Sequence, residues 1–170
     1  QQVAGYPATA AAAALLPMTV LNILLSSYFG NLSGRFGPRL FMTIGPIVGG
    51  AGDLLLLRGE GSVHYWFDVF PGIVVFGLGL SMTVAPLTAA ILGSISAAQS
   101  GIGSAVNNAV SRVAGLVAIA LAGVIVGDTL DTDGFHRGLI ATAVLLVAGG
   151  LVSAAGIRNP TRTAAAAPTR

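Results

Sequence analysis

The sequence predicts an all-α, polytopic membrane protein with five transmembrane helices. Of its 170 residues, 54% are hydrophobic and only 8% are charged, whereas a soluble domain carries roughly 25% charged residues. Five long apolar runs alternate with short polar segments, and the arginines stand singly at the ends of these runs. Because this number of charges is too small to cover a water-facing surface, we expect most of the surface to face the lipid bilayer or other helices.

The charged and chemically reactive residues argue against several classes of function. All eight basic residues are arginines and they are scattered, so there is no basic face on which nucleic acid would dock. The chain has no cysteine, and His64 and His136 are far apart, so no metal site is expected. No nucleotide-binding or hydrolase motif is present. We therefore expect no catalysis and no cofactor.

Residues 8–29 form the first predicted span. A helix rising 1.5 Å per residue covers about 33 Å over this length, enough for a hydrocarbon core of about 30 Å. Pro17 frees a carbonyl group and should bend the helix, which neighbouring helices tolerate in a membrane. Asn22 lies well inside the span, so we expect it to face the bundle and make it a candidate cavity-lining residue.

Residues 30–39 are predicted to form a short basic turn. The glycines Gly30, Gly34 and Gly37 are expected to let the backbone adopt positive φ and neighbouring helices come close. Arg35 and Arg39 supply the charges, and arginine in a short loop between two spans is typical of the cytoplasmic side.

The second span, residues 40–57, contains a carboxylate. Gly45 and Gly49 have the GxxxG spacing of closely packed membrane helices. Asp53 is a candidate proton site, because an ionisable group inside a span is functional by default. The alternative is an interfacial carboxylate that is solvated or paired with Arg58. The short distance to the loop, about 7 Å along the helix, favours this alternative.

The third span covers residues 69–92. Pro71 suits a first helical turn, and Gly77 and Gly79 are expected to thin one face. Tyr65 and Trp66 precede the span, where they form either an interfacial aromatic belt or simple loop packing.

The fourth span, residues 101–127, has an apolar part, 113–126, that is too short to cross a membrane alone. The crossing must therefore include Asn107, Asn108 and Arg112. Asn108 and Arg112 share one helix face. In one interpretation both residues line an inner cavity. In the other, Arg112 reaches the lipid headgroups and Asn108 supports helix packing.

The fifth span covers residues 135–157, and residues 158–170 are expected to be a disordered cytoplasmic tail. Five spans place the two chain ends on opposite sides of the membrane. The arginine distribution predicts an outside N-terminus and a cytoplasmic C-terminus. The cytoplasmic set is Arg35, Arg39, Arg158, Arg162 and Arg170, and the outer set is Arg58 and Arg137.

The turn resembles the cytoplasmic signature of the major facilitator superfamily, G-x-L-a-D-R-x-G-R-R. The matching residues are Gly30, Leu32, Arg35, Gly37 and Arg39. The segments Gly-Tyr-Pro at 5–7, Leu-Leu-Pro-Met-Thr at 15–19, Phe-Gly-Leu-Gly-Leu at 76–80 and Gly-Ser-Ala-Val-Asn-Asn at 103–108 look like successive regions of the drug:proton antiporters with 14 helices. Position 34 is Gly where the family has an acidic residue, so this copy is expected to lack the gating role of that carboxylate.

The resemblance implies the last five helices, and thus most of the C-terminal bundle, of a transporter in the cell membrane. Its partners would be the missing N-terminal half, a small-molecule substrate and protons. The implied function is proton-coupled efflux of drugs or small solutes by alternating access. Two alternatives stay open: a facilitator of another substrate class, such as a sugar or an amino acid, and a stand-alone small membrane scaffold or regulatory subunit.

Overall fold

The computed structural model describes residues 7–58, 64–93, 99–127, 131–157 and 159. Over this part of the chain the secondary structure is helical. The α-helices are α1 (Ala8–Ala14), α2 (Leu16–Phe36), α3 (Pro38–Leu55), α4 (Phe70–Gly93), α5 (Ser100–Val126) and α6 (Thr132–Gly156). A 3-10 turn, η1 (Leu56–Arg58), follows α3, and a π-helical turn, η2 (Tyr65–Val69), precedes α4.

Five stretches of these helices are long and apolar enough to cross a membrane. They are Ala8–Phe36, Pro38–Arg58, Tyr65–Thr88, Ser100–Val126 and Thr132–Gly156. The predicted fold class, an all-α polytopic membrane protein, is therefore confirmed. The predicted tail falls on residue 158 and residues 160–170, which lie outside the described residues, as do Arg158, Arg162 and Arg170.

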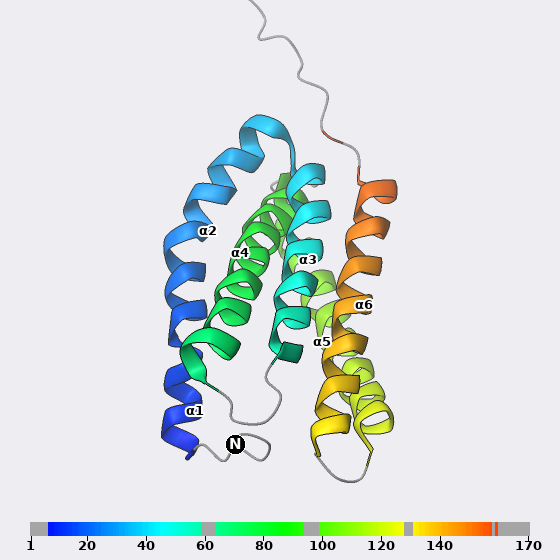
Figure 1. The fold of residues 1–170 in the computed structure, drawn as a ribbon. Helices are drawn as coiled ribbons and strands as arrows, with labels where there is room; N and C mark the ends of the chain where they lie inside the picture. The colour runs from blue at the N-terminus through cyan, green and yellow to red at the C-terminus, as the bar shows by residue number, and fades with distance from the viewer. Residues whose placement is uncertain (1–6, 59–63, 94–98, 128–130, 158, 160–170) are drawn as a thin grey trace, which may run out of the picture.

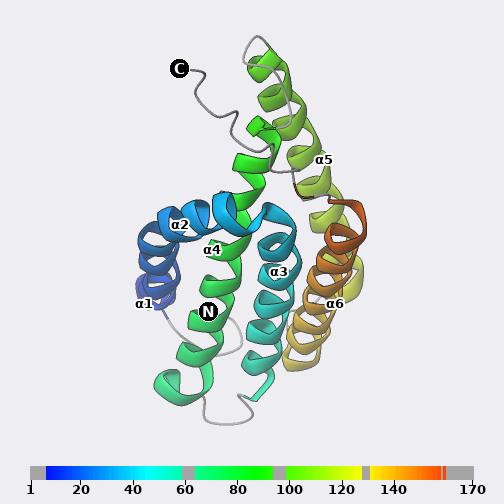
Figure 2. The same ribbon diagram turned by 90° about the horizontal axis from the view of Figure 1, so that it is seen from above.

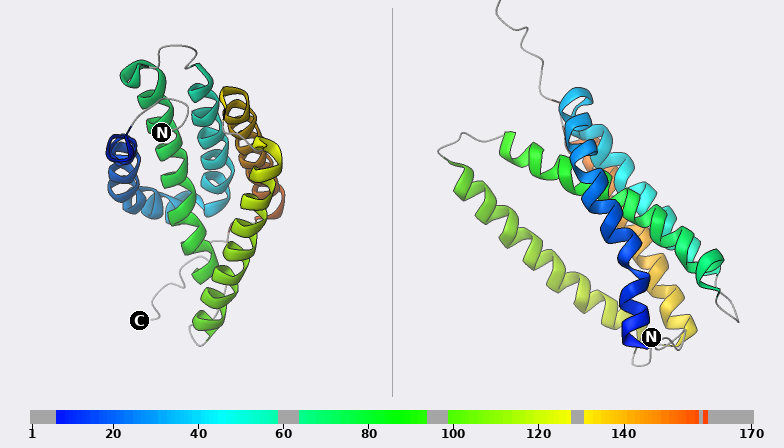
Figure 3. Two further views of the ribbon diagram at one scale, coloured as in Figure 1. Left: turned by 90° about the horizontal axis from the view of Figure 1, so that it is seen from below. Right: turned by 90° about the vertical axis from the view of Figure 1, so that its left-hand side faces the viewer.

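The helices stand side by side in the order α2, α4, α3, α6, α5 (Figures 1 and 2). α3 is central and packs against α4 on one side and α6 on the other, antiparallel to both. α2 covers the far side of α4. α5 touches α6 and α4 sparsely, and it diverges from the other helices toward its N-terminal end (Figure 3). No residue of α5 is buried.

Glycines bring the backbones of α3 and α4 into contact. A Cβ atom added to Gly79 would lie 2.6 Å from the carbonyl oxygen of Gly45 and 2.7 Å from Cα of Gly49. The predicted GxxxG face of α3 therefore packs directly on α4. Gly77 does not share this face, contrary to expectation, because its own Cβ would lie 3.1 Å from Cα of Met18 on α2. Residues two apart point to nearly opposite sides of a helix.

A second small-residue contact joins α3 to α6. A Cβ on Gly50 would lie 3.1 Å from the carbonyl oxygen of Ala143, and one on Gly150 would lie 2.7 Å from that of Thr43. α3 is thus pressed between two helices because glycine occupies both of its faces. Gly149, next to Gly150, has no described neighbour within 4 Å of an added Cβ, so it lies outside this contact.

The predicted turn at residues 30–39 is much shorter than expected. α2 continues to Phe36, and α3 begins at Pro38. Among its three glycines only Gly37 has a positive φ, of 90°. With a ψ of 150° this backbone conformation is essentially restricted to glycine and breaks the helix at one residue, and Pro38 is preorganised for the first position of the next helix. Gly30 and Gly34 therefore remain helical.

The first span is interrupted at Leu15, which separates α1 from α2 two residues before Pro17. This confirms the predicted disturbance at the proline. The hydroxyl of Tyr65 in η2 donates a hydrogen bond of 3.1 Å to the carbonyl oxygen of Ala14. A distant turn thus satisfies a carbonyl at the break, where the regular helix bonding of the first span is interrupted.

Candidate functional site

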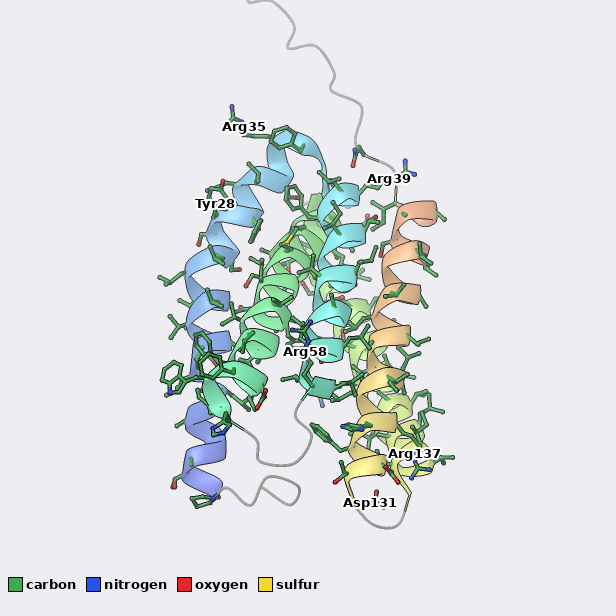
Figure 4. All side chains as sticks on the ribbon, viewed as in Figure 1. Tyr28, Arg35, Arg39, Arg58, Asp131 and Arg137 are labelled. Carbon is green, nitrogen blue, oxygen red and sulfur yellow. The ribbon has the colours of Figure 1, made fainter. Side chains whose placement is uncertain are left out.

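Different charged residues lie at the two ends of the bundle (Figure 4). Arg35 and Arg39 lie at the end that contains Gly37 and the last turn of α6, which we call the turn end. Asp131 and Arg137 lie at the opposite end, which we call the acidic end. Arg58 lies nearer the acidic end, at the level of the last turns of α3.

The residues of the signature belong to two helices. Gly30 and Leu32 lie in the last turns of α2, and a Cβ on Gly30 would lie 3.6 Å from Cβ of Ala85 on α4. Gly30 therefore faces α4 at an ordinary contact distance. Arg35 and Arg39 are exposed on either side of Gly37. Gly34 has no neighbour within 4 Å of an added Cβ, so the backbone at that position packs on nothing.

Asp53 is buried inside the bundle, with 6% of its surface exposed. It lies four residues after Gly49, whose added Cβ would be 3.7 Å from Leu146 on α6 and 3.9 Å from Phe76 on α4, and so on the side of α3 that faces both helices. Among the described residues its Oδ2 atom has no hydrogen-bond partner, and no ion pair joins it to Arg58. The favoured expectation of a solvated or paired carboxylate is therefore wrong. Packing of neighbouring helices explains the difference, because distance along α3 alone takes no account of them.

The polar residues of α5 point in two directions. Asn107 is half-buried and follows Gly103, also half-buried, by one helical turn. Asn108 and Arg112 are exposed on another line that includes Ser104. From residue 113 to the end of α5 every residue is apolar or glycine. The helix therefore carries its polar residues in its first half, where Ser104, Asn108 and Arg112 form one exposed line that we call the polar strip and Ser111 is exposed beside it.

The five candidate residues do not converge on one site. Asn22 is half-buried on α2, whereas the strip lies on α5 at the other flank of the bundle (Figures 1 and 2). Asp53 lies between them on central α3. The structure thus provides three separate polar positions within the predicted spans. Among the described residues, no group of three His, Asp or Glu side chains is placed to hold a metal ion.

The sequence pattern did not predict the remote contacts of two residues, Tyr65 and Asn159. Tyr65 donates a hydrogen bond to the carbonyl oxygen of Ala14 at the break in the first span, although the sequence pattern indicated only an interfacial aromatic belt or loop packing. Asn159 bonds the turn between α2 and α3, and its partner is 120 residues away. No local pattern reports such contacts. The sequence gives one indication of the contact at Asn159. Gly37 at the start of α3 has no side chain that could accept a hydrogen bond from the first amides of the helix, so another residue can supply the cap.

Comparison with known proteins relates the chain to a resistance protein. It is 28% identical over 152 residues to the methylenomycin A resistance protein of Streptomyces coelicolor. The matched region is 89% of this chain and 32% of that protein, so the chain spans about a third of the length of the curated relative. No family model matches the chain, and no solved structure matches it. The multi-pass membrane fold is thus accompanied by similarity to a protein named for antibiotic resistance.

Proposed function

We propose that this chain is part of the C-terminal transmembrane bundle of a drug exporter of the major facilitator type, driven by the proton gradient. The similarity over 152 residues to a methylenomycin A resistance protein carries the proposal. The signature residues around Gly37 support it, because they join two of the five membrane-crossing helices. A bundle of such helices suits movement of a compound across a bilayer better than its chemical modification.

Asp53 is the proposed proton site. It is a carboxylate within a span, it is buried in the bundle, and its Oδ2 atom has no partner among the residues that the structure describes. A charged side chain in that setting carries a penalty of a few kcal/mol, which is why such residues commonly mark proton relays. Within the described part of the chain no arginine pairs with it, which distinguishes it from a carboxylate held in a structural ion pair.

The polar strip on α5 is the proposed contribution to the substrate cavity. Asn108 and Arg112 are exposed on a helix that is apolar or glycine from residue 113 to its end. Polar residues at membrane depth face a bundle interior or a water-filled cavity rather than lipid. We assign this face to the cavity between this bundle and the N-terminal half of the transporter. Asn22 on α2 would face the same partner from the other flank.

Transport by the complete protein in a drug-sensitive bacterium tests the proposal. We expect it to lower the accumulation of a cationic dye, and an uncoupler to restore accumulation. Asp53→Asn should abolish this gradient-driven efflux, whereas Asp133→Asn, at an exposed position at the start of α6, should not. Efflux that persists in the presence of the uncoupler would contradict proton coupling. Unchanged efflux by the Asp53→Asn variant would remove Asp53 as the proton site.

We propose that the turn end is cytoplasmic and that the acidic end is outside. The arginines of the turn support this orientation, because arginine is enriched in short cytoplasmic loops. The chain has no cysteine, so single cysteines report the sidedness of each end directly. In intact cells a membrane-impermeant thiol reagent should label Arg137→Cys and leave Gly34→Cys unlabelled. Labelling of Gly34→Cys alone would reverse the orientation.

A further inference from the structure

A residue just beyond α6 lies on the turn between α2 and α3. Oδ1 of Asn159 accepts a hydrogen bond of 3.2 Å from the backbone N–H of Arg39. A Cβ added to Gly37 would overlap the amide of Asn159, with Nδ2 at 2.7 Å. The side chain of Asn159 therefore occupies the space that glycine leaves open at position 37.

This hydrogen bond has the geometry of a helix cap. The first amides of a helix have no partner within the helix. A capping side chain normally accepts from the second or third of them. Gly37 occupies the capping position of α3 and has no side chain, and Pro38 has no N–H. Arg39 is the second residue of α3, so Asn159 supplies from α6 the acceptor that the local sequence lacks.

The contact also lies where two packed helices end together. α6 lies along α3 through Gly50 and Gly150, and Gly150 is the contact nearer the turn end. Asn159 extends this interface beyond the last turn of α6, onto the backbone of the turn. We propose that Asn159 is a clasp that caps α3 from α6 and holds the two helices together at the turn end. Any separation of α3 and α6 at that end must first break this hydrogen bond.

Exchange of the Arg39 amide with solvent measures the clasp directly. The full chain, labelled with ¹⁵N-arginine in detergent micelles, gives few resonances, and the Arg35 amide within α2 serves as an internal reference. Loss of a capping side chain amounts to about 1 kcal/mol, so Asn159→Ala should speed exchange at Arg39 about fivefold. Asn159→Asp keeps an acceptor and should preserve or increase protection. Asn31→Ala, an exposed asparagine on α2, is the matched control.

A second variant tests the same contact from the turn. Gly37→Ala leaves Asn159 in the sequence, but its methyl group would displace the asparagine amide, and alanine is also strained at the positive φ of this position. Exchange at Arg39 should therefore increase at least as much as in Asn159→Ala. The clasp is refuted if Asn159→Ala leaves Arg39 as protected as before, or if Asn159→Asp loses protection to the same extent as Asn159→Ala. None of these measurements depends on transport, so the clasp and the proposed function are tested separately.

Discussion

Gly79→Ala should disrupt the central helix pair, although it adds only one methyl group. The new Cβ would lie 2.6 Å from the carbonyl oxygen of Gly45 and 2.7 Å from Cα of Gly49. Ordinary contacts of a Cβ begin at 3.4 Å, so the space is short by about 0.8 Å at its tightest carbonyl contact. Both neighbours are backbone atoms and cannot rotate away. α3 and α4 must therefore move apart.

The magnitude follows from this rigidity. Overpacking a well-packed interior costs typically 1–3 kcal/mol, and a clash between backbones lies in the upper part of that range. We expect Gly79→Ala to lower the free energy of unfolding by about 2–3 kcal/mol. This corresponds to a change of about 30- to 150-fold in the unfolding equilibrium constant.

The matched control lies within the same contact. A Cβ on Gly49 would meet only Leu146 Cδ1 at 3.7 Å and Phe76 Cδ2 at 3.9 Å, which are ordinary contacts. Gly49→Ala should therefore be tolerated, although GxxxG spacing alone predicts that it is as harmful as its partner. Helicity followed during titration with a denaturing detergent measures both variants. Equal stability of Gly79→Ala and the parent chain would refute the backbone contact, as would equal losses in the two variants.

Two further predictions concern hydrogen bonds to helix ends. Tyr65→Phe removes the donor to the Ala14 carbonyl oxygen at the break of the first span. It should therefore lower the free energy of unfolding by about 1 kcal/mol in the same titration. An unchanged midpoint would mean that another group satisfies this carbonyl. Asp131 caps α6 by accepting a 2.7 Å hydrogen bond from the N–H of Gly134, so Asp131→Ala should cost about 1 kcal/mol while Asp131→Asn retains most of the stability. Equal losses in the two Asp131 variants would exclude capping.

The sequence alone determined the fold class and the approximate places of the five spans. Long runs without charge can be stable only in lipid or against other helices, and their length must match the bilayer. The start of one helix was also predictable from a local residue. Pro71 lies in the first turn of α4 as predicted, because the ring of proline fixes φ whatever its neighbours are.

The turn at residues 30–39 shows where local reasoning fails. Three glycines permit positive φ, but nothing in the sequence says which of them adopts it. Gly37 does, whereas Gly30 stays helical, and a Cβ there would make only an ordinary contact of 3.6 Å with Cβ of Ala85 on α4. The same residue type breaks the helix in one case and continues it in the other, and residue type alone does not decide between them.

Tertiary structure alone decided the environment of each candidate site residue. Asp53 is buried because neighbouring helices pack on central α3, and the arrangement of α5 leaves Asn108 and Arg112 exposed. The cap on Arg39 comes from Asn159, a residue 120 positions away. Hydrophobicity and length act on each segment separately, so a sequence reports them directly. Burial and remote hydrogen bonds arise between segments, and they exist only once the helices have packed.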